Sequence, residues 1–77
     1  MTEEKILEFI RSRGKTDKVE RDTDLFKGGY VNSLFAVEIV LFLEKTFKIR
    51  LKDKDITQDN FRTVAAIANL VDRVRGV

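Results

Sequence analysis

The stretch Phe26-Lys27-Gly28-Gly29-Tyr30-Val31-Asn32-Ser33-Leu34 joins a glycine-bearing loop to a long apolar helical pattern. That pattern predicts a helix over residues 33–47, so Ser33 stands where the helix begins. Free backbone N–H groups and the helix macrodipole favour an anion at this end of a helix, including a phosphate attached to a serine. The junction is therefore the first candidate site in the chain.

The predicted helix over residues 33–47 is apolar on most sides. One broad arc of its helical wheel is entirely apolar and is the expected core face: Phe35, Ala36, Ile39, Val40, Phe42, Leu43 and Phe47. The opposite arc mixes apolar with charged side chains, namely Leu34, Val37, Leu41, Glu38, Glu44 and Lys45. We expect the three apolar residues of this second arc to be partly exposed.

Two further helices are predicted at the ends of the chain. The first has Thr2 as its N-cap and ends near Gly14, and the last follows an N-cap Thr63 and ends by Gly76. The last helix repeats apolar residues at three- and four-residue spacing. The chain therefore predicts an all-α fold, a small antiparallel bundle of three principal helices and one short helix.

The remaining segments are predicted to be loops. Residues 15–32 form a long first loop that Leu25 and Phe26 pin over the bundle. Gly28 and Gly29 are expected to permit positive φ in its turn. The short helix is expected at residues 57–61, where the apolar anchors are Ile56 and Phe61.

The composition of the chain limits the kinds of protein to which it can belong. Its 77 residues, 43% hydrophobic and 36% charged, predict one compact soluble domain over residues 1–77. The longest apolar run, Ile39 to Leu43, is too short to span a membrane, so we expect a cytoplasmic protein without a membrane partner. The chain has no Cys and no His, the commonest nucleophilic and acid–base side chains. We therefore expect neither an enzyme nor a metal site.

The formal net charge of +2 raises the question of nucleic-acid binding. The basic excess lies in the last third of the chain, where Lys48, Arg50, Lys52 and Lys54 alternate with apolar and acidic residues. This spacing is typical of a solvated loop, whereas a nucleic-acid interface needs a continuous basic face. We therefore expect no nucleic-acid partner.

Asn32-Ser33-Leu34 resembles the Asp-Ser-Leu motif of acyl and peptidyl carrier proteins, the phosphopantetheine-binding family, whose serine bears a 4′-phosphopantetheine arm. The flanking residues also resemble that family, from Leu25-Phe26 ahead of the serine to Phe47-Lys48-Ile49 in place of Phe-Gly-Ile and Thr63-Val64 at the last helix. The resemblance extends over most of the chain, in the same order of elements.

The resemblance implies that a phosphopantetheinyl transferase, using coenzyme A and magnesium, attaches the arm to the Ser33 hydroxyl. The arm supplies the thiol that the sequence lacks, and an acyl or aminoacyl group is carried on it as a thioester. The implied partners are this transferase, a loading enzyme (an acyltransferase or an adenylating enzyme), and a ketosynthase or other downstream synthase domain. The carrier itself is expected to be a monomer.

The resemblance also implies a docking surface for partner enzymes, formed by Asn32, Leu34, Val37, Glu38, Leu41 and Glu44. Small exposed apolar spots within a charged rim suit weak, rapidly exchanging interfaces. The alternative is that the apolar members pack under the long loop or against the last helix, while the glutamates solvate the helix.

Two departures from the family pattern refine the expected subtype. Asn32 replaces the usual Asp, which keeps a capping residue but removes a negative charge. The chain is slightly basic, whereas carriers of fatty acid synthesis are usually strongly acidic. The neutral Asn32 bears on partner recognition, and the slightly basic charge favours a discrete carrier of polyketide or nonribosomal peptide biosynthesis. Residues 30–35 and 59–63 look like those of small carriers for unusual polyketide extender units.

Two alternatives remain at the level of sequence. Ser33 could be an ordinary N-cap serine. The chain could then be a small helical adaptor that binds a partner helix through Leu34, Val37 and Leu41 and never carries a prosthetic group. The identity of the carried group is not encoded in any obvious pocket residue.

Overall fold

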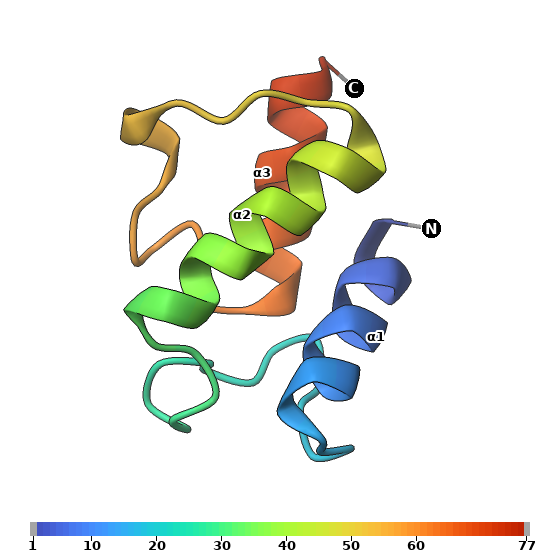
Figure 1. Cartoon of the computed structure of the whole chain (residues 1–77), viewed down its shortest axis with the longest axis vertical. Helices are drawn as coiled ribbons and strands as arrows, with labels where there is room; N and C mark the ends of the chain where they lie inside the picture. Colours follow the sequence, from blue (N-terminus) through green and yellow to red (C-terminus); the bar gives the residue numbers. More distant parts are fainter. Residues whose placement is uncertain (1, 77) are drawn as a thin grey trace.

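A computed structural model describes residues 2–76, which form three α-helices and one short 3-10 helix and contain no strand. The α-helices are α1 (Thr2–Gly14), α2 (Ser33–Phe47) and α3 (Val64–Arg75), and the 3-10 helix is η1 (Asp53–Asp55). Figure 1 shows α1 running opposite to both other helices, while α2 and α3 share a general direction because the segment between them crosses back along the molecule. The expected all-α fold is confirmed.

Helix α1 packs directly against α3. Its buried residues, Ile6 and Ile10, lie one turn apart on the same face, as the spacing predicts. Acidic residues in the first turn and arginines in the last turn complement the helix dipole. Thr2 was expected to be the N-cap but is the first residue of the helix itself.

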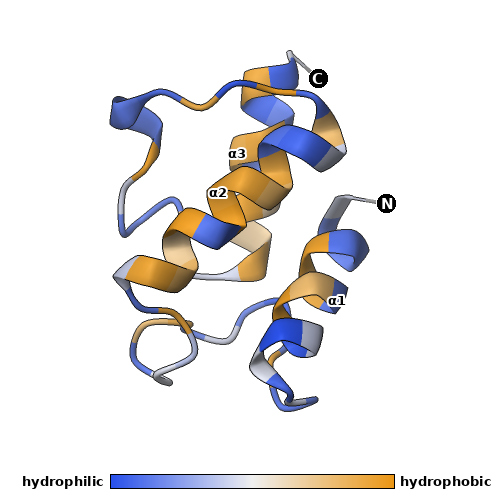
Figure 2. Cartoon of the chain, in the orientation of Figure 1, coloured by the Kyte–Doolittle hydropathy of each residue, from blue (hydrophilic) through white to orange (hydrophobic). Residues whose placement is uncertain are grey.

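Helix α3 has the predicted cap. The Thr63 hydroxyl accepts a hydrogen bond of 3.0 Å from the Ala66 N–H, and Gly76 ends the helix at φ 82°. Its buried side chains are Val64, Ile67, Ala68, Leu70 and Val71. Figure 2 shows that α2, in front of α3 in this view, is apolar along much of its visible length. Within residues 2–76, no helix combines the length and the apolar character needed to cross a bilayer.

The long first loop is held by the core and by backbone hydrogen bonds. Leu25 is fully buried and Phe26 packs half-buried beside the core, as predicted. The Leu25 N–H donates to the Arg62 carbonyl over 2.7 Å, and the Ala65 N–H donates to the Arg21 carbonyl over 3.0 Å. These two bonds attach the loop to the start of α3.

An ion pair attaches the same loop to α1. The Arg21 guanidinium donates to both oxygens of the Glu3 carboxylate, over 2.7 and 3.1 Å. These hydrogen bonds lower the pKa of Glu3 below its usual value. The contribution of the pair to stability is therefore present above the ordinary glutamate pKa and is lost as the pH falls through the lowered pKa.

The short helix lies at Asp53–Asp55 rather than at the predicted residues 57–61. It forms there because the Asp55 carboxylate accepts a hydrogen bond from the Lys52 N–H over 3.1 Å. Residues 57–61 form a hydrogen-bonded turn instead. Phe61 is buried as predicted, but Ile56 is 42% exposed, so its prediction as an anchor was wrong.

Leu25→Ala should lower the free energy of unfolding by about 3 kcal/mol, because it opens a cavity where the loop meets the core. The matched change Leu34→Ala removes an exposed side chain and should change stability by less than about 0.5 kcal/mol. Urea unfolding followed by circular dichroism measures both values. Equal losses in the two variants would contradict the placement of Leu25 as the anchor of the loop.

Candidate functional site

Asn32 caps α2, and Ser33 is the first helical residue. The Asn32 side-chain oxygen accepts a hydrogen bond of 2.9 Å from the Phe35 N–H, and its backbone carbonyl accepts one of 2.8 Å from the Ala36 N–H. Its backbone is extended, as in an N-cap residue. The interpretation of Ser33 as an ordinary N-cap serine was therefore wrong, because the neighbouring asparagine does that work.

The Ser33 side chain is exposed at a fixed position. Tyr30 and Val31 both donate their backbone N–H groups to the Leu25 carbonyl, over 2.9 and 3.1 Å. Val31 is also buried. The backbone is thus held two residues ahead of the serine, and Asn32 fixes the serine itself at the first turn of the helix.

Gly28 and Gly29 are needed in the loop for different structural reasons. Gly29 has φ 76°, the left-handed conformation expected for this turn. Gly28 does not, and it is required for another reason: a Cβ atom there would lie 2.6 Å from the Tyr30 ring. Gly28 therefore lets Tyr30, a half-buried loop anchor, fold back over the turn.

The electrostatics of this end of α2 suit an anion. The first turn contains no acidic residue, and Asn32 is neutral where an aspartate would add a negative charge. An exposed hydroxyl at the positive end of a helix can accept a phosphate group without burying its charge. The chain contains no histidine and no cysteine, and no acidic residue lies in the first turn of α2 beside the hydroxyl.

A small hollow lies directly beside the serine. Its volume is about 290 Å³ and most of its lining is apolar: Phe26, Ser33, Ala36, Ile56, Thr57, Gln58 and Phe61. The exposed side chain of Ile56 forms part of this lining. The hollow could not be predicted from the sequence, because its two walls, the start of α2 and the segment before α3, are distant in sequence.

Three apolar side chains project from α2, and we call Leu34, Val37 and Leu41 the α2 apolar surface. Their exposed fractions are 74%, 56% and 60%. The expectation of partial exposure is confirmed. The alternative, in which these residues pack under the loop or against α3, is wrong.

The two glutamates expected to border this surface have partners within the chain. Glu38 forms an ion pair with Arg13 of α1. Glu44 accepts a hydrogen bond of 2.9 Å from the Leu51 N–H, which holds the segment that follows α2. Both carboxylates therefore support neighbouring elements, and the surface between them is mainly apolar.

Comparison with known proteins agrees with this geometry. A family model described as "Phosphopantetheine attachment site" matches residues 4–71. The chain is 32% identical over 74 residues to the D-alanyl carrier proteins of Streptococcus pyogenes serotype M1 and of serotype M5 (strain Manfredo), and the match covers 95% of this chain and 94% of each relative.

These matches cover almost the whole chain, including the loop, α2 and most of α3. The family implies a covalently attached 4′-phosphopantetheine group, and its members work with a phosphopantetheinyl transferase and with loading enzymes. The exposed hydroxyl at the positive end of α2 fits such a group. The chain therefore belongs to the phosphopantetheine-binding carrier proteins, which tether intermediates and do not catalyse their conversion.

Proposed function

We propose that Ser33 is the residue that receives the 4′-phosphopantetheine arm, through a phosphodiester formed from coenzyme A by a phosphopantetheinyl transferase. The observation that carries the proposal is the exposed Ser33 side chain at the first position of α2, next to an asparagine that already caps the helix. The arm, once attached, supplies a thiol that holds an acyl or aminoacyl group as a thioester.

The protein itself contributes the position of the arm. A rigidly held serine gives the arm a fixed origin, so a partner docked on the protein meets the carried group at high effective concentration. The hollow beside Ser33 lies close enough for the arm to rest against its apolar wall. The chain needs no catalytic group for this work, which agrees with its lack of histidine and cysteine.

We propose that partner enzymes dock on α2 around Ser33, over Asn32, Leu34, Val37, Glu38, Leu41 and Glu44. The α2 apolar surface would supply most of the binding energy, since its three members are the most exposed large apolar side chains described. Glu38 and Glu44 would act indirectly, because their bonds to Arg13 and to the Leu51 backbone fix the edges of the surface.

The proposed setting is polyketide or nonribosomal peptide biosynthesis in the cytoplasm, with an acyltransferase or adenylating enzyme as loader and a ketosynthase or other synthase domain downstream. The slightly basic charge and the neutral Asn32 support a carrier distinct from the acidic carriers of fatty acid synthesis. An unusual polyketide extender unit is one group that such a carrier would hold.

A second candidate is a carrier of an aminoacyl group such as D-alanine, which the name of the similar streptococcal proteins favours. The loading step separates the two settings. An adenylating enzyme that charges the modified protein with D-alanine would favour the second candidate, and an acyltransferase that charges it with a malonyl-type group would favour the first.

Ser33→Ala should abolish modification by a broad-specificity phosphopantetheinyl transferase and coenzyme A, because the accepting hydroxyl is removed. The matched control is Ser12→Ala, since Ser12 is the other serine of the chain and is also exposed. Intact-protein mass spectrometry should show one added arm on the unaltered protein and on Ser12→Ala, and none on Ser33→Ala. No mass gain on the unaltered protein would favour the helical adaptor.

Leu41→Ala should lower the transferase kcat/KM for this protein about tenfold, chiefly through KM, because it removes an exposed contact of about 1.4 kcal/mol. Lys45→Ala is the matched control, one turn further along α2 and also exposed. Steady-state kinetics with varied carrier concentration measures both. Equal effects in the two variants would show that the α2 apolar surface has no special part in docking.

A further inference from the structure

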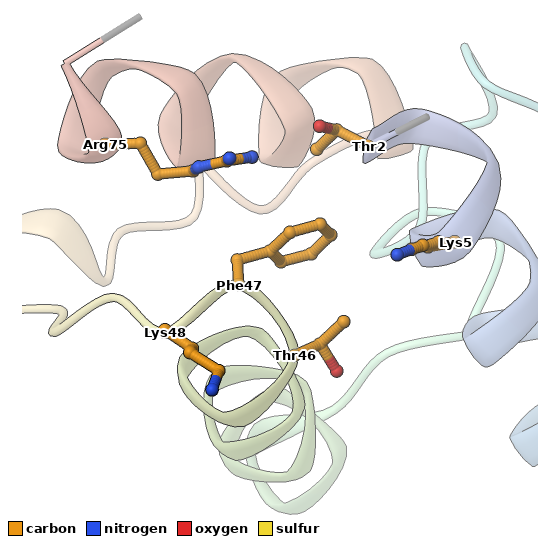
Figure 3. Close-up of a pocket in the computed structure, with 6 residues that line it drawn as sticks. All are labelled: Thr2, Lys5, Thr46, Phe47, Lys48 and Arg75. Carbon is orange, nitrogen blue, oxygen red and sulfur yellow. The ribbon is translucent and has the colours of Figure 1, made fainter.

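A second hollow lies at the end of the molecule opposite Ser33, and we call it the basic hollow. Its volume is about 440 Å³, and its lining is Thr2, Lys5, Thr46, Phe47, Lys48 and Arg75 (Figure 3). The three cations come from α1, from the residue after α2, and from α3. Since α2 rises about 1.5 Å per residue, Phe47 lies about 20 Å from Ser33.

The three cations of the basic hollow have no ion-pair partner among residues 2–76. Among residues 2–76, salt bridges join Arg13, Arg21 and Arg62 to nearby carboxylates, and none joins Lys5, Lys48 or Arg75. None of the acidic residues between positions 2 and 76 lines the hollow. Like charges gathered in this way repel one another, so a negatively charged ligand would relieve the repulsion.

The position of Lys48 adds a second observation. Its φ of 56° is left-handed, a conformation that favours glycine at the end of a helix and costs other residues stability. A cation that only complements the dipole of α2 needs no such conformation, because Lys45 already serves that purpose in the last turn. Lys15, which follows α1, has a similar φ of 52°, so this conformation alone assigns no role to either lysine; Lys48 differs from Lys15 because it lines the basic hollow.

The arrangement of the side chains indicates the shape of the ligand. Figure 3 shows the Phe47 ring between the charged ends of Lys5 and Arg75, whereas the Lys48 side chain extends away from the ring, so the three charged groups do not converge on one point. The Arg75 guanidinium carbon lies 5.9 Å from the ring centroid. Cations that do not converge offer no single phosphate site, whereas an extended peptide could place separate carboxylates near each of them and an apolar side chain on the ring.

We propose that the basic hollow docks an acidic segment of a partner protein, with carboxylates near Lys5, Lys48 and Arg75 and an apolar side chain against Phe47. Because the hollow is remote from Ser33, such a segment can stay bound while the arm and the α2 apolar surface face an active site. The inference goes beyond the carrier function and does not depend on modification of Ser33.

The test is a titration of the ¹⁵N-labelled full chain, followed by two-dimensional NMR, with a short peptide rich in glutamate that has one central leucine. We expect shifts at the amides of Lys5, Phe47 and Lys48 and none at Ser33 or Leu34. The triple variant Lys5→Gln, Lys48→Gln, Arg75→Gln should weaken binding at least about tenfold at low salt.

The matched control neutralises three other exposed lysines, Lys18, Lys27 and Lys54, and so removes the same net charge. It should retain the affinity of the unaltered protein. Equal weakening in the two triple variants, shifts outside the basic hollow, or equally tight binding of a short RNA would each overturn the proposal. The same titration with Ser33→Ala should give the same shifts as the unaltered protein. The result therefore does not depend on the carrier function.

Discussion

The backbone of Leu25 fixes where α2 begins, and the site depends on that position. Its N–H is bonded to the Arg62 carbonyl, and its own carbonyl accepts the N–H groups of Tyr30 and Val31. The Leu25 side chain is fully buried. Its backbone hydrogen bonds join the loop to the start of α3 and to the residues just before α2.

Successive parts of α2 present different features. The first turn presents an exposed serine at the positive end of the helix, the middle presents three apolar side chains, and the far end contributes to a basic hollow. The acidic side chains of the helix are occupied with Arg13 and with the Leu51 backbone. The chain thus provides position and contact surfaces, while a prosthetic group supplies the reactive thiol.

The periodic parts of the structure could be predicted from the sequence, and the parts set by single hydrogen bonds could not. Helical spacing placed all three α-helices, and the mixed arc of α2 correctly predicted the exposure of Leu34 and its neighbours. The short helix was misplaced because one bond from the Lys52 N–H to Asp55 decides its position. Asn32 and Ser33 are both good capping residues, so only the structure shows which one caps. The partners of Glu38 and Glu44 are distant or backbone groups that no spacing reveals.

The central claim is that the hydroxyl at the first position of α2 becomes the phosphodiester. Trypsin cleaves after Lys27 and Lys45 and so releases residues 28–45, which contain one serine, Ser33, and one tyrosine, Tyr30. Tandem mass spectrometry of this peptide from the modified protein locates the arm directly. The account predicts fragments that place the whole added mass on Ser33. An arm on Tyr30, or on any peptide outside residues 28–45, would contradict it.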